Sequence, residues 1–237
     1  QTPVSNSRPL AIAGRDTISL TWAVPVIGNH TMRAWTILAT DPNRVNDTTA
    51  IYNFTVVPDN VVFQEGFNNT TFPPPGWLIV DRDTDAVGNN WYLAVSSPAP
   101  YEGPSYAADN FQSANANNYI DDYLITPNIP GGVPGEVDSL VFWGKSRFTS
   151  PGYPDSLDVR VSTTGRDTSN FTTRLRYFRV DTAWTRYAFA LPAGATRYIA
   201  FRYLLYDGGP VGNNSDKVCV DDVRVIRTQP APTPGWV

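Results

Sequence analysis

Short runs in which apolar and polar residues alternate recur along the chain. In residues 185–191 (TRYAFAL), bulky apolar side chains occupy every second position after Thr185, and residues 157–161 (LDVRV) and 199–203 (IAFRY) repeat the pattern. A period of two places one face of a β-strand in a core and the other toward solvent. Prolines and glycines separate the runs, and no long series has the period of an amphipathic helix. The pattern therefore predicts an all-β protein.

The alternating runs divide the chain into three parts. Residues 59–227 contain many half-buried strands joined by long loops, which predicts a two-sheet jelly-roll β-sandwich. Residues 1–58 contain three or four strand-like runs, within 17–57, and resemble the later part of an immunoglobulin-like sandwich. Residues 228–237 contain three prolines and are predicted to form a Pro-rich tail.

The immunoglobulin-like part, residues 1–58, is too short to be a whole domain. Such a sandwich needs about seven strands and about 100 residues. The chain is therefore an excised fragment, a small atypical domain, or a domain completed by a strand from a neighbouring subunit. Strand donation of that kind is head-to-tail and would build an open filament. Residues 4–12 and the C-terminal tail are the candidate donors, although prolines weaken the tail as a paired strand.

Charge and composition narrow the possible partners. The formal net charge is −4, which argues against nucleic acid, and no apolar run is long enough to be a transmembrane segment. The chain has neither an initiator Met nor a signal peptide, which is typical of a mature or excised piece. The single cysteine, Cys219, cannot form an intrachain disulfide and is expected to be a small buried hydrophobe.

Asparagine glycosylation sequons are frequent and favour a secreted, cell-surface glycoprotein. Chance would give about three sequons, whereas this chain has seven. The alternative is that Asn and Thr simply populate turns together. The sequons begin at Asn29, Asn46, Asn53, Asn68, Asn69, Asn170 and Asn213.

The order of several short motifs over residues 61–226 resembles the cleaved-adhesin and choice-of-anchor J modules of secreted bacterial surface proteins, which are relatives of the MAM-like jelly rolls. The matching strings are FQEGF at 63–67, PGW at 75–77, DRDTD at 81–85 followed by Trp91, DYLITP at 122–127, LVFW at 140–143, VSTTG at 161–165, IAFR at 199–202 and VDDV at 220–223. Residues 17–57 separately resemble the immunoglobulin-like domain that often precedes such modules. The resemblance implies a non-catalytic extracellular module, often calcium-bound, that serves adhesion, carbohydrate contact or scaffolding.

Acidic residues inside apolar strands are the candidate metal ligands. A carboxylate in a strand is costly unless something compensates it, and Ca²⁺ takes six to eight oxygen ligands. The resemblance implies a calcium site that joins Glu65 in the first strand of the jelly roll with Asp221 or Asp222 in the last. Asp81, Asp83 and Asp85 alternate in an acidic loop, and either bind calcium or form a solvated turn.

The sequence offers no catalytic constellation. The only histidine, His30, has no predicted Ser or Cys partner, and the three glutamates are isolated. We therefore expect an adhesion or structural module that contacts other copies of itself or a neighbouring surface protein. The alternative is a carbohydrate-binding module excised from a larger hydrolase or protease, with Trp91 and Tyr92 contacting glycans. The same aromatics could instead anchor loops to the core.

Overall fold

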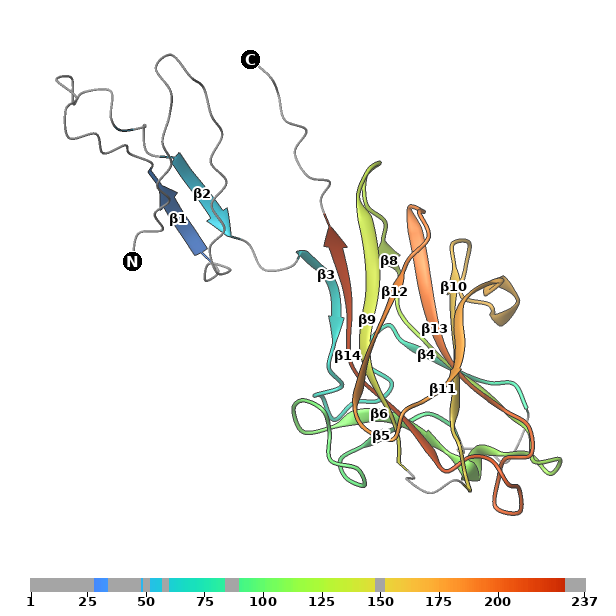
Figure 1. Ribbon diagram of the computed structural model, residues 1–237. Coiled ribbons are helices and arrows are strands. Elements are labelled where there is room, and N and C mark those ends of the chain that lie inside the picture. Colours follow the sequence, from blue (N-terminus) through green and yellow to red (C-terminus); the bar gives the residue numbers. More distant parts are fainter. Residues whose placement is uncertain are drawn as a thin grey trace, which may run out of the picture. The chain divides into compact units, whose positions relative to one another are not determined.

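The computed structural model describes residues 28–33, 48, 52–56, 60–83, 90–147 and 152–228 (Figure 1). The chain divides into two compact units, Gln1–Pro58 and Asp59–Val237. In the first unit, β1 (Gly28–Met32) and β2 (Tyr52–Val56) form an antiparallel pair. The remaining predicted strands of this unit, and the Pro-rich tail after Thr228, lie outside the described residues.

The second unit is built from two antiparallel sheets, which confirms the predicted all-β sandwich. The first sheet has the order β11-β10-β13-β7-β4, with β8 also paired to β13. Its strands are β4 (Leu78–Asp81), β7 (Ile120–Ile125), β8 (Ile129–Pro130), β10 (Ser156–Ser162), β11 (Thr173–Arg179) and β13 (Thr196–Leu205).

The second sheet has the order β12-β9-β14-β6-β5, with β3 also paired to β14. Its strands are β3 (Asn60–Glu65), β5 (Tyr92–Ala94), β6 (Tyr106–Asn110), β9 (Val137–Ser146), β12 (Thr185–Ala190) and β14 (Lys217–Thr228). Two short 3₁₀ helices, η2 (Phe111–Ser113) and η3 (Thr168–Asn170), lie in the connections. No helix in this part of the chain is long and apolar enough to cross a membrane.

The core lies between the two sheets, where the alternating apolar side chains meet. Phe142 of β9 and Phe201 of β13 are fully buried, and their rings meet edge to face with centroids 5.0 Å apart. In β12, Tyr187 and Phe189 pack against this core, whereas Arg186 is exposed. The alternation therefore predicted correctly which side chains of β12 face inward.

Strand β14 changes partner halfway along its length. Its first half pairs with β6 and its second half with β3, while β9 runs along the other edge (Figure 1). The register with β9 shifts between Asp221 and Arg224, and Asp222 adopts a left-handed backbone with φ of 45°. Such a bulge bends a strand and redirects its side chains. The two acidic residues of the VDDV string thus lie where the pairing is interrupted.

Asp155 ties four segments of the sandwich together. Its buried carboxylate accepts hydrogen bonds from the Ser146 hydroxyl (2.6 Å), the Tyr203 hydroxyl (2.5 Å) and the amides of Asp216 (2.9 Å) and Lys217 (3.2 Å). Burial raises the pKa of Asp155, and the hydrogen bonds from Ser146 and Tyr203 partly offset this effect. The group joins β9 and β14 of one sheet to β13 of the other.

We expect Asp155→Ala to lower the free energy of unfolding by about 3 kcal/mol or more. The substitution leaves several buried donors without an acceptor, and each costs about 1–3 kcal/mol. Urea unfolding measures the change, with Asp167→Ala as the control because the exposed Asp167 side chain makes no capping hydrogen bond. Equal stability of the two variants would contradict the role given to Asp155.

Candidate functional site

A cluster of aspartates lies at one end of the first sheet. Asp81 ends β4 and pairs in register with Asp122 of β7, and Asp83 follows two residues after Asp81. One carboxylate oxygen of each residue lies within 4.8 Å of those of the other two. Asp83 is positioned by its Oδ2 atom, which accepts a hydrogen bond of 2.8 Å from the Asp121 amide. Asp83 and Asp122 are buried, and Asp81 is half-buried.

Asp109 reaches the same cluster from β6 of the opposite sheet. Its carboxyl is fully buried, and its Oδ1 atom accepts hydrogen bonds from the Ser113 hydroxyl (2.6 Å) and the Asn110 amide (2.7 Å). Burial raises the pKa of Asp109 to about 8, and repulsion from Asp83 adds to the shift. The Oδ2 atom is buried, and a side-chain hydrogen bond between the carboxyl groups of Asp109 and Asp122 opposes the rise in pKa. Together, the four aspartates form an interior acidic cluster that spans both sheets.

The interior acidic cluster has the chemistry of a hard-cation site. Like charges held this close oppose each other's ionisation, and burial adds a penalty for each charge. A cation between them removes both costs. Every candidate ligand atom is a carboxylate oxygen, which is the type of ligand that Ca²⁺ prefers. Structural zinc sites typically use nitrogen and sulfur ligands instead. The buried carboxyl groups of Asp83, Asp109 and Asp122, with the half-buried one of Asp81, are a donor set that fits such an ion.

Trp91 is buried beside Asp122, one of the four aspartates of the cluster. Its ring is 1% exposed, and its Nε1 atom donates a hydrogen bond of 3.2 Å to the carbonyl oxygen of Asp122. It therefore offers no face to a sugar, which corrects the predicted carbohydrate contact at Trp91 in favour of the core-anchoring alternative. Tyr92 is half-buried, with the Lys217 amine 5.7 Å from its ring centroid.

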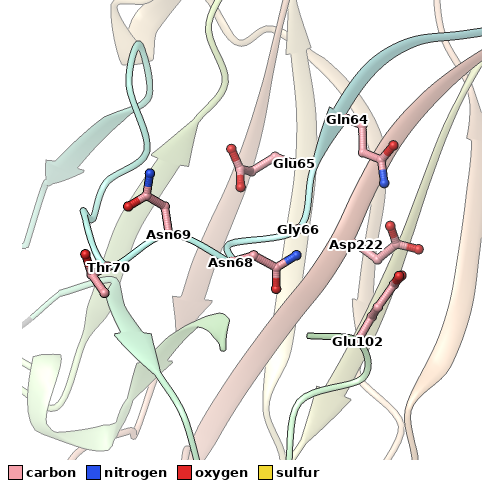
Figure 2. A pocket seen from close by; sticks show the side chains of 8 residues that line it. All are labelled: Gln64, Glu65, Gly66, Asn68, Asn69, Thr70, Glu102 and Asp222. Carbon is pink, nitrogen blue, oxygen red and sulfur yellow. The ribbon is translucent and has the colours of Figure 1, made fainter. Parts of the chain in front are cut away.

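The acidic residues of the first and last jelly-roll strands line a separate surface pocket (Figure 2). The cavity volume is about 720 Å³, and the lining residues are Gln64, Glu65, Gly66, Asn68, Asn69, Thr70, Glu102 and Asp222. We call this cavity the strand-end pocket. Glu65 pairs in register with Val223, next to Asp222, so strand pairing brings the two predicted ligands to one place. The joint calcium site that the family resemblance implied at these two residues stays a prediction.

Each acid at the strand-end pocket already has a protein partner. Glu65 Oε1 accepts a hydrogen bond of 2.6 Å from the Phe67 amide. Asp222 Oδ1 accepts one of 2.7 Å from Arg224 Nε, and Arg224 also lies 3.5 Å from Glu102. Arg224 thus supplies positive charge that an ion would otherwise bring. The electrostatic case for a cation is consequently weaker here than at the interior acidic cluster.

Asp221 is not among the residues that line the pocket, and it anchors a loop. Its Oδ2 atom accepts hydrogen bonds from the amides of Tyr101 (3.0 Å) and Glu102 (3.1 Å). Burial raises the pKa of Asp221 to about 6, although these amides oppose the shift. The anchored Tyr101 ring stacks on Trp143 with centroids 3.8 Å apart. The acid predicted as a metal ligand is therefore used to hold the loop that carries Glu102.

The structure brings together only part of the predicted ligand set. Asp81 and Asp83 meet in the cluster, whereas Asp85 lies outside the described residues. Asp109 and Asp122, which also belong to the cluster, were not among the predicted ligands. Asp122 stood in a recognised string, DYLITP, yet nothing in the sequence shows that it pairs with Asp81. Asp109 follows two alanines in a buried strand, and that burial of an acid was the available signal.

The other single residues fall into simpler roles. Cys219 is buried among Tyr106 and Ala108, as expected for a small core hydrophobe, and burial raises its pKa. Of the sequon asparagines, Asn68, Asn69 and Asn213 are exposed and Asn170 is half-buried. The side chains of Asn29 and Asn53 and all of Asn46 lie outside the described part of the chain.

One protein family matches most of this chain. The family described as Cleaved Adhesin Domain matches residues 60–225. Hemagglutinin A of Porphyromonas gingivalis is 33% identical over 173 residues, which cover 60% of this chain and 7% of that protein. Lys-gingipain W83 of the same organism is 32% identical over 173 residues, which cover 60% of this chain and 9% of that protein. The matches thus span a small fraction of these curated relatives.

A solved structure shows the same fold. The crystal structure of the K1 cleaved adhesin domain of Lys-gingipain from Porphyromonas gingivalis W83 superposes with a TM-score of 0.56 at 23% sequence identity. The superposition covers 71% of this chain and 98% of that domain. The similarity therefore includes nearly the whole of the solved domain and supports the two-sheet sandwich described above.

Proposed function

Because this chain belongs to the cleaved adhesin family, we propose that it is a non-catalytic extracellular adhesion module of a bacterial cell-surface protein. The observation that carries the proposal is the family match over residues 60–225, which includes nearly all the strands of the sandwich. One relative is named a hemagglutinin, which supports a role in contact with cells. The exposed sequon asparagines at Asn68, Asn69 and Asn213 are proposed glycan carriers on this surface.

Calcium is the proposed structural ion of the module. Asp81, Asp83, Asp109 and Asp122 would hold it between the two sheets, with backbone carbonyls or waters as further ligands. The bound ion supplies positive charge and no reaction chemistry. Its role would be to fix β4 and β7 of one sheet against β6 of the other. The strand-end pocket, with Glu65, Glu102 and Asp222, is the second candidate site.

Self-assembly into a filament is a separate proposal about the first unit. It is supported by the small number of strands that the sequence predicts over residues 17–57. Strand donation from a neighbouring copy would complete such a sandwich. We expect electron microscopy of the concentrated chain to show ordered fibres, since head-to-tail contacts do not close. A monomeric mass by light scattering at all concentrations would contradict the proposal.

The alternative function is that of a carbohydrate-binding module. The burial of Trp91 removes one of its two predicted contacts, and Tyr92 is partly covered by Lys217. Neutral-glycan binding that Tyr92→Ala abolishes would favour this alternative. We place it second because these two aromatics do not form an exposed platform.

The adhesion role predicts that beads coated with the chain bind mammalian cells. We expect more bound cells than on beads coated with an unrelated β-sandwich of similar size and charge, because adhesion would depend on a specific surface rather than on non-specific protein contact. Flow cytometry of fluorescent beads measures the difference. Equal binding of the two bead types would contradict the proposed function.

The calcium proposal predicts a calcium-dependent melting temperature. A ligand present at 100 times its dissociation constant stabilises the native state by about 2.7 kcal/mol. For a domain of this size, that energy raises the melting temperature by about 5–10 °C. We expect chelator to lower the midpoint measured by calorimetry, and added calcium to restore it.

Two substitutions assign the effect to one of the two sites. Asp122→Asn should abolish the response to calcium, whereas Asp222→Asn should preserve most of it because Arg224 already neutralises Asp222. If Asp222→Asn abolishes the calcium response and Asp122→Asn preserves it, the ion binds in the strand-end pocket and not in the interior acidic cluster. A melting temperature that chelator leaves unchanged would mean that neither site holds structural calcium.

A further inference from the structure

The outer face of the first sheet concentrates positive charge on an acidic protein. In-register pairing places Tyr177, Asp158, Arg202, Tyr123 and Val80 in one row across β11, β10, β13, β7 and β4 (Figure 1). The neighbouring rows follow from the two-residue period of each strand. The arginines on or beside this face are Arg82, Arg160, Arg166, Arg174, Arg179 and Arg202, which we call the arginine face.

Two buried aspartates, Asp121 and Asp158, bind arginines of this face but do not cancel its positive charge. Asp158 contacts Arg160 (2.7 Å), Arg174 (2.9 Å) and Arg202 (3.4 Å), and Asp121 binds Arg202. Counted with the exposed Asp167 that follows Arg166, six arginines against three aspartates leave a charge of +3 on this face. Since the formal net charge of the chain is −4, the rest of the chain carries −7.

The arginines also present their donors to solvent. The Arg174 side chain is 48% exposed although it contacts Asp158, and Arg82 and Arg179 are exposed. Arg166 is half-buried, and its Nη2 atom donates to the carbonyl oxygen of Ile125 (3.5 Å), so the exposed donors come from the other three arginines. Guanidinium groups bind sulfate and carboxylate groups through two parallel hydrogen bonds, so this face has unused capacity for bidentate anion contacts.

Tyrosine rings lie between these charges. Tyr177 is 45% exposed, and the Arg174 guanidinium lies 5.6 Å from its ring centroid. The Arg166 guanidinium lies 6.0 Å from the ring centroid of the half-buried Tyr198. An aromatic ring beside a cation offers an apolar face to the C–H groups of a sugar and a charge to its acidic substituent. Rows on one strand face repeat about every 6.8 Å, which suits a repeating anionic chain.

We propose that the arginine face binds an acidic polysaccharide, a sugar chain bearing sulfate or carboxylate groups. The inference rests on the proposed extracellular adhesion function and names the partner class and the surface that would recognise it. The positive charge of the arginine face favours an anionic partner. The tyrosine rings beside the arginines favour a sugar chain, because each ring offers an apolar face to sugar C–H groups. The surface lies on the first sheet, whereas the strand-end pocket lies at β3 and β14 of the second.

The test measures binding of the whole chain to heparin, which is sulfated, and to hyaluronate, which is carboxylated. Neutral dextran, duplex DNA and anionic phospholipid vesicles serve as comparison probes in calorimetry at physiological salt. We expect saturable binding to at least one of the two acidic polysaccharides that weakens as salt rises, and none to dextran. Absence of binding to both, or equally tight binding to DNA or vesicles, would overturn the proposal.

Matched variants locate the surface. We expect the triple variant Arg82→Gln, Arg174→Gln, Arg179→Gln to bind about tenfold more weakly, because it removes three exposed charges. Asp158 loses Arg174 but keeps Arg160 and Arg202 in that variant, and a melting temperature close to that of the wild type checks that the fold is intact. We expect Tyr177→Ala to weaken polysaccharide binding, although it leaves the net charge of the arginine face unchanged. The control, Arg186→Gln, removes one exposed arginine of β12 in the second sheet, and it is compared with Arg179→Gln, which removes one charge of the arginine face.

Equal weakening by Arg186→Gln and Arg179→Gln would overturn the assignment to the arginine face. The calcium response of the melting temperature tests the calcium proposal and not the acidic-polysaccharide proposal, so the two proposals can fail independently. A triple variant that keeps the calcium response but loses polysaccharide binding supports the arginine face. A wild-type chain that responds to calcium and binds cells but no acidic polysaccharide contradicts this inference alone.

Discussion

The sandwich depends on how it compensates carboxylates that its own strands bury. Among the described residues of the second unit, ten aspartates are buried, several of them in the middle of strands. An ionised carboxylate without compensation is too costly to bury, so each one dictates what must surround it. Arginines compensate Asp158 and Asp138, hydrogen-bond donors compensate Asp155, and backbone amides compensate Asp221. Many of these arginines, donors and amides come from distant parts of the chain. The contacts that compensate the buried carboxylates therefore also fix how the two sheets pack together.

The alternating pattern was sufficient to predict the strands because their period depends only on local sequence. It predicted the inward residues of β12 and the sandwich architecture. The same local argument could not find the partner of each acid. Asp81 meets Asp122 through strand register, and Asp109 approaches from the opposite sheet. Asp221 looked like a metal ligand, yet it binds the amides of Tyr101 and Glu102, about 120 positions earlier. Such long-range contacts follow from topology, which a single sequence leaves open.

Different parts of this fold have different proposed roles. The interior acidic cluster links the sheets and would hold the ion that makes the frame rigid. The outer face of the first sheet carries the charge that would recognise a partner. Asp121 connects these regions directly, because its amide donates to Asp83 while its carboxylate binds Arg202. A cation in the cluster would thereby stabilise the strand that positions part of the arginine face.

Terbium luminescence tests the central claim, that the interior acidic cluster holds a calcium ion. Tb³⁺ replaces Ca²⁺ at oxygen-rich sites, and a nearby indole transfers energy to it. Trp91 donates a hydrogen bond to the carbonyl of Asp122, so its ring lies beside the cluster. The account predicts strong tryptophan-sensitised emission that calcium displaces and that Asp122→Asn abolishes. Emission that is absent, or that is unchanged by Asp122→Asn, would contradict it.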